Sequence, residues 1–291
     1  SSHIPALHLL CNLGWNFLST AACLALRGST REVVLRPRLV EVLQTRCFEY
    51  KGAWYPLSPS GIEQIVRELS ALSLTEGLLP ANERLYQMLA LGITVTEFMP
   101  DGKKHQPTIA VIDWAEPAAN RWEVTEELEV LSTHGTHSRI PDLVCYVNGL
   151  PLVVIEAKRP ESGKAEKATV DEGISQNLRN QRHDEIPQLF AYAQLLLAVN
   201  HSEGRYGTTF TAAKFWARWR EEEFTDGQLA AWKNRPLSAA THAALFADKP
   251  AKLRDHFEQL WAQPMLPTEQ DRLLVALLTP ARLLEFLRFF V

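Results

Sequence analysis

The stretch 142–158 constrains the fold more than any other part of the chain, because it specifies two adjacent strands and the turn between them. Residues 142–147 are rich in β-branched and aromatic side chains, which favours a strand. Asn148-Gly149 follows, and both residue types tolerate the positive φ of a tight hairpin turn. The continuous apolar run 152–155 is typical of a central strand covered on both faces. The sequence therefore predicts an antiparallel hairpin within a larger sheet.

Charged side chains mark the open end of this hairpin. Asp142 stands where the first strand begins, and Glu156-Ala157-Lys158 stands where the second strand ends. Two carboxylates at hydrogen-bond distance repel each other by about 4 kcal/mol at an effective dielectric of about 20, and a cation relieves this repulsion. Carboxylate oxygens and the carbonyl of Ala157 are ligands that suit Mg²⁺. Lys158 could then hold an attacking water or neutralise charge on a phosphoryl centre.

Whether these groups converge depends on the strand register, because side chains alternate between the two faces of a sheet and directly opposed residues share a face. A regular two-residue turn pairs Val147 with Leu150, which sends Asp142 and Glu156 to opposite faces. An odd-length loop, or a bulge at Pro151, brings both carboxylates to one face. Proline cannot donate to a sheet, so the sequence permits an irregular pairing there. If the groups diverge, they are only the solvated end of a hairpin.

Pro141-Asp142 followed by Glu156-Ala157-Lys158 resembles the PD-(D/E)xK nuclease signature. The surrounding residues 141–160 resemble the nuclease domain of the motor/endonuclease subunit of type I restriction-modification enzymes. The resemblance covers most of the chain and includes the segments 32–35, 38–39, 82–86, 111–114, 120–122 and 176–192. It implies an α/β fold of the restriction-endonuclease type, with a mixed central sheet flanked by helices.

The same resemblance implies a type I site-specific deoxyribonuclease, which hydrolyses phosphodiester bonds of double-stranded DNA with Mg²⁺. It assigns metal binding to Asp142, Glu156 and Ala157, and catalysis to Asp142, Glu156 and Lys158 with Gln176 assisting. Specificity and methyltransferase subunits are the implied partners, and ATP acts only through a helicase-like motor domain. The alternative is a non-catalytic assembly or DNA-docking module that retains the nuclease fold. Convergence of the two carboxylates with Lys158 distinguishes these interpretations.

Gln176 stands at the first position of the QxxxY motif of that family, in a segment 169–182 that we expect to be helical. It could bind the DNA backbone or the active-site lysine, or it could be an exposed helix glutamine. The tyrosine position is occupied by Asn180, which cannot stack or reach as a phenol does. The substitution leaves the role of the second motif residue open, but it does not affect the metal site.

Patterns elsewhere predict further strands and helices. The segments 93–98 and 108–114 read as strands that, by the family resemblance, precede the hairpin in the same sheet. Glu63 or Glu68, on a predicted helix, could supply a further acidic ligand, and a solvated helix face is the alternative reading. We also expect helices over 38–46, 62–72 and 80–91, and antiparallel strands over 195–199 and 206–211.

Composition sets the expected context. The net charge of −4 is unusual for a DNA-binding protein, so we expect weak DNA binding by the chain alone. Four cysteines without metal-type spacing indicate reduced thiols in the cytoplasm, and no stretch suits a membrane span.

A charged loop over 159–167 follows the hairpin but has no P-loop motif. We predict a nuclease domain over 1–263, and over 264–291 a linker and the beginning of a motor domain.

Overall fold

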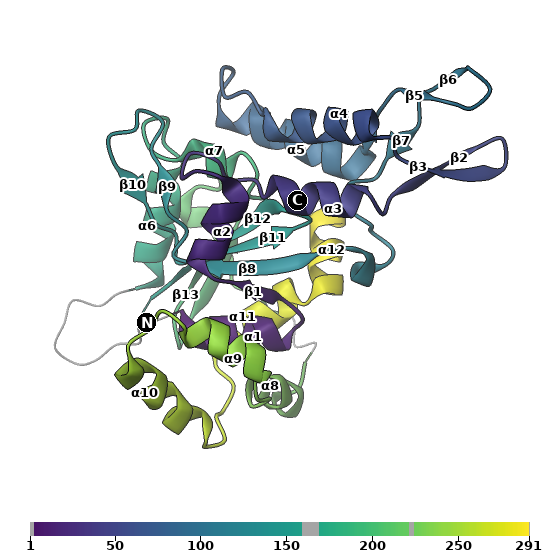
Figure 1. Ribbon diagram of the computed structural model, residues 1–291. Coiled ribbons are helices and arrows are strands. Elements are labelled where there is room, and N and C mark those ends of the chain that lie inside the picture. Colours follow the sequence, from purple (N-terminus) through teal and green to yellow (C-terminus); the bar gives the residue numbers. More distant parts are fainter. Residues whose placement is uncertain (1–2, 159–168, 221–223, 291) are drawn as a thin grey trace.

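A six-stranded mixed sheet forms the centre of the computed structural model, which describes residues 3–158, 169–220 and 224–290 (Figure 1). Neighbouring strands are antiparallel except in the parallel pairs β1/β8 and β12/β13. The expected α/β class is therefore confirmed, while the charged loop over 159–167 lies outside the described residues. In spatial order the strands are β1 (Asn16–Leu18), β8 (Trp122–Glu126), β11 (Leu143–Val147), β12 (Leu150–Ala157), β13 (Leu195–Val199) and β14 (Gly204–Gly207).

Helices cover both sides of this sheet. In Figure 1, α3, α4 and α5 lie above it, and α1, α8, α9 and α11 lie below it. Helix α6 packs on β12 and β13, and α2 packs on β8. The helices are α1 (Ile4–Asn12), α2 (Thr20–Arg27), α3 (Arg36–Leu43), α4 (Pro59–Ser70), α5 (Leu78–Leu91), α6 (Val170–Asn180), α7 (Pro187–Phe190), α8 (Asp226–Lys233), α9 (Ala239–Phe246), α10 (Ala251–Trp261), α11 (Glu269–Leu278) and α12 (Pro280–Phe289). The helices expected over 38–46, 62–72, 80–91 and 169–182 are confirmed within a few residues. None of these helices is long and apolar enough to span a membrane.

The hairpin β11/β12 combines a regular turn with a bulge. Asn148 and Gly149 form the two-residue turn with φ of 54° and 81°. A Cβ on Gly149 would lie 2.6 Å from the backbone oxygen of Leu35, the residue that caps the N-terminus of α3. Farther along, Cys145 lies opposite Val153 whereas the next residue, Tyr146, lies opposite Pro151. One extra residue of β12 is therefore left between these pairs. The bulge, rather than an odd-length loop, sets the register.

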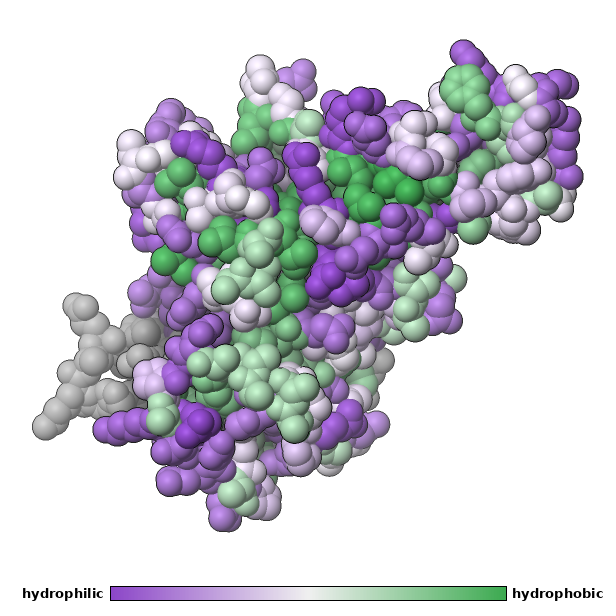
Figure 2. Space-filling view, viewed as in Figure 1, coloured by the Kyte–Doolittle hydropathy of each residue, from purple (hydrophilic) through white to green (hydrophobic). Residues whose placement is uncertain are grey.

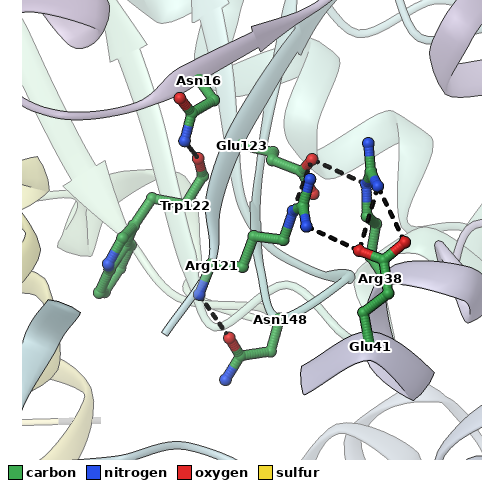
Figure 3. Close-up of polar contacts among 7 residues, drawn as sticks. All are labelled: Asn16, Arg38, Glu41, Arg121, Trp122, Glu123 and Asn148. Atoms are coloured by element: carbon green, nitrogen blue, oxygen red, sulfur yellow. Dashed lines mark hydrogen bonds and ion pairs between the residues drawn. The ribbon is translucent and has the colours of Figure 1, made fainter. Parts of the chain in front are cut away.

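The side chain of Asn148 fixes the turn to the preceding chain. Its Nδ2 donates to the carbonyl oxygen of Val111 and to Oδ1 of Asn120, both at 2.9 Å. Its Oδ1 accepts a 2.7 Å hydrogen bond from the backbone of Arg121, as Figure 3 shows. Every polar atom of this amide side chain thus has a partner, as a fully buried group requires.

A buried ionic network ties β8 to α3 beside this turn (Figure 3). The carboxylate of Glu123, which is 1% exposed, lies 2.9 Å from Arg38 of α3 and 3.0 Å from Arg121. Both arginines also pair with Glu41 at the surface. Because the buried charge is compensated by two guanidinium groups, β8 can carry a glutamate next to the centre of the sheet.

The expectation that 93–98 and 108–114 belong to the central sheet is wrong. They are split among the short pairs β4/β7 (Ile93–Thr94 with Thr108–Ile109) and β5/β6 (Glu97–Phe98 with Lys104–His105), outside the central sheet. A tight turn at Gly102 (φ 79°) folds this segment back on itself, so its strands pair locally. The position beside β11 is taken by β8, for which no strand was predicted.

Other short pairs lie outside the central sheet. The hairpin β2/β3 packs its aromatic face on β6, and the pair β9/β10 directly precedes β11. The expected antiparallel pairing of β13 with the following strand is confirmed, but β14 ends before the turn in which Phe210 has a φ of 72°. The remaining bounds are β2 (Cys47–Tyr50), β3 (Ala53–Pro56), β9 (Val130–Leu131) and β10 (Ser138–Arg139).

The last two helices belong to the same hydrophobic core as the first. Helix α11 is buried along most of its length and packs against α1. Nε1 of Trp15 donates a 2.7 Å hydrogen bond to the carbonyl oxygen of Leu278 at the end of α11. Helix α12 begins with Pro280 in its first turn, where proline is favoured because its missing N–H has no helical partner. The domain boundary after residue 263 stays a prediction.

Candidate active site

Asp142 and Glu156 lie side by side at the open end of the hairpin. Leu143 is paired with Ile155, so the next opposed positions along the two strands are 142 and 156. Oδ2 of Asp142 accepts a 2.8 Å hydrogen bond from the backbone N–H of Ala157. The Glu156 side chain is only 4% exposed, whereas that of Asp142 is 24% exposed. The bulge therefore brings both carboxyl groups to one face, as this chemistry requires.

Lys158 completes the group. Its Nζ lies 3.5 Å from Oε2 of Glu156 and 3.9 Å from Oδ2 of Asp142, and it also donates a hydrogen bond to Oε1 of Gln176. The backbone N–H of Lys158 donates to the carbonyl oxygen of Val199 at 2.8 Å, which holds this residue against β13. The structure thus gathers the four side chains that the sequence singled out.

Burial, and next the charge of Asp142, raise the pKa of Glu156 to about 8, while the neighbouring Lys158 acts in the opposite direction. Without a further cation, Glu156 is therefore mostly protonated at neutral pH. A divalent cation beside both carboxyl groups would allow both to ionise. Two adjacent carboxyl groups, one of them almost fully buried, therefore fit a divalent metal ion.

The donor set fits a cation that retains water ligands. Within residues 3–158, 169–220 and 224–290, no cluster of three or more His, Cys, Asp or Glu side chains is placed to hold a metal. Asp142 and Glu156 are thus a pair of adjacent side-chain donors, and the carbonyl of Ala157 as a third donor stays a prediction. Mg²⁺ is typically bound by one or two carboxylates and keeps several waters, so this arrangement suits Mg²⁺.

Glu63 and Glu68, the two candidates for an extra acidic ligand, do not join this group. Glu63 lines a groove of about 410 Å³ between α3 and α4, among the apolar side chains of Val40, Ile62 and Val66. Figure 2 shows the hydrophobic surface in this region. Glu68 instead accepts a 3.1 Å hydrogen bond from Gln64 one turn earlier on α4. Both therefore fit the alternative reading of helix-face residues.

The two motif positions on α6 face different surroundings. Gln176 reaches Lys158, which matches one of the alternatives considered for it. Asn180 is 3% exposed, and its backbone oxygen accepts a hydrogen bond from Ile186. Asn177, which was not predicted to have a role, donates a 3.4 Å hydrogen bond from Nδ2 to the carbonyl oxygen of Leu197 in β13. The sequence did contain a usable signal: Gly173, Asn177 and Asn180 are spaced four and three residues apart, so they share one face of a helix. In the structure all three are buried.

A mixed sheet with flanking helices, and two carboxyl groups beside a lysine on adjacent strands, are features of a nuclease-like α/β domain. Residues 2–215 match the family described as type I restriction enzyme R protein N terminus. The chain belongs to this family.

Curated relatives carry the same classification in their names. The chain is 28% identical over 235 residues to the type I restriction enzyme HindI endonuclease subunit of Haemophilus influenzae, a match that covers 81% of this chain and 18% of that protein. It is 31% identical over 124 residues to the putative type I restriction enzyme MjaIXP endonuclease subunit of Methanocaldococcus jannaschii, and this match covers 42% of the chain and 11% of that protein. The putative type I restriction enzyme MjaVIIIP endonuclease subunit of the same organism is 29% identical over 190 residues, and this match covers 65% of the chain and 16% of that protein. The chain thus spans less than a fifth of the length of these relatives.

Proposed function

We propose that this chain is the Mg²⁺-dependent endonuclease domain of a cytoplasmic type I restriction enzyme, and that it hydrolyses phosphodiester bonds of double-stranded DNA. The observation that carries this proposal is the position of Lys158, whose Nζ lies within 3.9 Å of carboxylate oxygens of both Asp142 and Glu156. Membership of the restriction enzyme family supports it. The proposed partners are DNA and the specificity and methyltransferase subunits. ATP would be used by a motor domain elsewhere in the full subunit.

Each residue has a definable task in this reaction. Asp142, Glu156 and the carbonyl of Ala157 would hold Mg²⁺, which lowers the pKa of a bound water and stabilises negative charge on the phosphoryl group. The N–H of Ala157 orients the carboxylate of Asp142. Lys158, held by Gln176, would donate to the attacking water or to the charged phosphoryl oxygens. Burial is the main reason that Glu156 holds its proton near neutral pH, and a cation beside it would favour the ionised form, so Glu156 would release this proton when the cation binds.

A nicking assay with the full subunit complex tests this proposal. Wild type and Asp142→Ala are compared on supercoiled plasmid with Mg²⁺, with Ca²⁺ and with a chelator. Glu63→Gln is the matched control, because Glu63 is a carboxylate of the same domain that lies between α3 and α4. We expect cleavage by wild type and by the control with Mg²⁺, none with chelator, and a loss of at least about 10²-fold in Asp142→Ala. Wild-type cleavage rates in Asp142→Ala would favour the non-catalytic assembly or DNA-docking module.

A further inference from the structure

Helix α6 lies unusually close to the strand that carries Glu156. A Cβ placed on Gly173 would lie 3.1 Å from Cβ of Ala198 and 3.3 Å from Cβ of Glu156. These two residues are direct partners in the parallel pair β12/β13. Carbon atoms in good contact are normally about 3.5–4.0 Å apart, so a side chain at this position would fit only if its neighbours moved by a few tenths of an ångström. The backbone of α6 therefore rests directly on the Glu156–Ala198 pair.

The close approach also determines the position of Gln176. Gly173 and Asn177 both face the sheet, Gly173 through its contact with β12 and β13 and Asn177 through its hydrogen bond to Leu197. Gln176 lies three residues after the glycine and immediately before the asparagine, and its Oε1 accepts a hydrogen bond from Lys158. The height of α6 above the sheet thus sets whether this amide oxygen reaches the lysine.

Backbone conformation does not require glycine at this position. Gly173 is absent from the glycines with positive φ, and it lies in the interior of α6. Glycine inside a helix is less favourable than alanine, because it loses more conformational freedom on folding. A glycine that is neither needed by the backbone nor favourable for the helix is explained by the close contact that it permits.

We infer that Gly173 is a positioning residue of the nuclease site: its missing side chain lets α6 approach β12 closely enough for Gln176 to hold Lys158. The inference rests on the proposed function only in that Lys158 and Gln176 take part in the reaction. Adding a methyl group at Gly173 forces a shift of a few tenths of an ångström between α6 and the sheet. This shift lengthens the contact between Gln176 and Lys158.

The test is a four-variant cycle read by two methods. Wild type, Gly173→Ala, Ala198→Gly and the double variant are compared, because Ala198→Gly removes the atom nearest to the new methyl group. The NMR signal of the Lys158 εCH₂ group in the chain reports the contact with Gln176 directly, and Gln176→Ala gives the signal of a lysine without it. Ser175→Ala, on the exposed side of α6, is the matched control for altered helix propensity. Plasmid cleavage by the full complex gives the second readout.

In Gly173→Ala we expect the Lys158 signal to move toward its position in Gln176→Ala and cleavage to fall about tenfold, since small misplacements of a catalytic group are costly. The double variant should recover most of the wild-type position of the Lys158 signal and most of the wild-type cleavage rate. Ser175→Ala should resemble wild type in both measurements. If Gly173→Ala does not fold, recovery of the fold and of the signal in the double variant supports the same contact. An unchanged Lys158 signal in folded Gly173→Ala, or a double variant no better than the single one, would overturn the inference. If the Lys158 signal moves as expected in the chain but the wild-type complex does not cleave, only the proposed function is refuted.

Discussion

The backbone N–H of Ala157 donates a 2.8 Å hydrogen bond across the hairpin to Oδ2 of Asp142. The bond joins the first carboxylate of the motif to the backbone of Ala157, the residue between Glu156 and Lys158. It therefore holds all three motif side chains in one relative arrangement, and it depends on the bulge that sets the register of β12. A shift of one residue in this register would move Asp142 to the face opposite Glu156.

The raised pKa of Glu156 predicts an unusual dependence of stability on pH in the absence of divalent cations. The unfolded chain releases this proton near the ordinary value of 4.5 and the folded chain near 8, so the folded state binds more protons between these values. Its contribution to the free energy of unfolding therefore decreases as pH rises through this window, by a few kcal/mol at most. Glu156→Gln, which cannot ionise, should be more stable than wild type at pH 8 and similar to it at pH 4.5.

Thermal or urea unfolding at the two pH values, with chelator present, measures this difference. Addition of Mg²⁺ at pH 8 should stabilise wild type and leave Glu156→Gln unchanged, because a ligand stabilises only the state that binds it. Equal pH dependence of the two proteins would show that Glu156 is not the buried acid that the structure describes.

The turn at Asn148 predicts two separable effects on stability. Asn148→Ala removes three hydrogen bonds and replaces an asparagine at φ 54° with a residue that tolerates this conformation less well. Asn148→Gly removes the same hydrogen bonds but places a residue that adopts this conformation freely. We expect a loss of roughly 2–4 kcal/mol for alanine and about 1 kcal/mol less for glycine, since a non-glycine residue in this region is strained by about that amount. Urea unfolding gives both values. Identical losses would mean that the backbone conformation of the turn contributes nothing.

The local parts of the site could be predicted from the sequence. The Asn-Gly turn, the apolar run of β12 and the charged residues that follow it each depend on neighbouring residues, so their patterns specify the hairpin. The two register alternatives also followed from the period of the strand. The choice between them did not, because β12 also pairs with β13, a strand that lies far along the chain and whose pairing the hairpin residues alone do not reveal.

Features that depend on residues far apart in the sequence could not be predicted in this way. The strand β8 contains Glu123 and Glu126 among its buried residues, so its sequence does not read as a buried strand. Its glutamates are tolerated because arginines and other cations from distant segments pair with them, such as Arg38 with Glu123 and Lys249 with Glu126. The contact of Gly173 with β12 and β13 is likewise set by packing of distant segments. Single-sequence patterns carry no record of such partners.

The net charge of −4 predicts weak binding of the isolated chain to DNA, with strong dependence on salt. Affinity for duplex DNA comes mainly from neutralised phosphates, so we expect a dissociation constant in the non-specific range of about 10⁻⁴–10⁻⁶ M. Arg182 is exposed two residues after α6, and Arg182→Ala should reduce the slope of log affinity against log salt by about one. Fluorescence anisotropy over a salt series measures this slope. Tight binding that is insensitive to salt would show a dedicated DNA clamp within the chain.

The central claim is that Asp142, Glu156 and Lys158 form the site of DNA cleavage. Its most direct test is plasmid cleavage measured alongside ATP hydrolysis in the assembled enzyme, with Glu156→Gln and Lys158→Ala as variants. Each should reduce cleavage by at least about 10²-fold, while ATP hydrolysis, which we assign to a separate motor domain, continues at the wild-type rate. Wild-type cleavage by Glu156→Gln would contradict the claim and place the active site elsewhere.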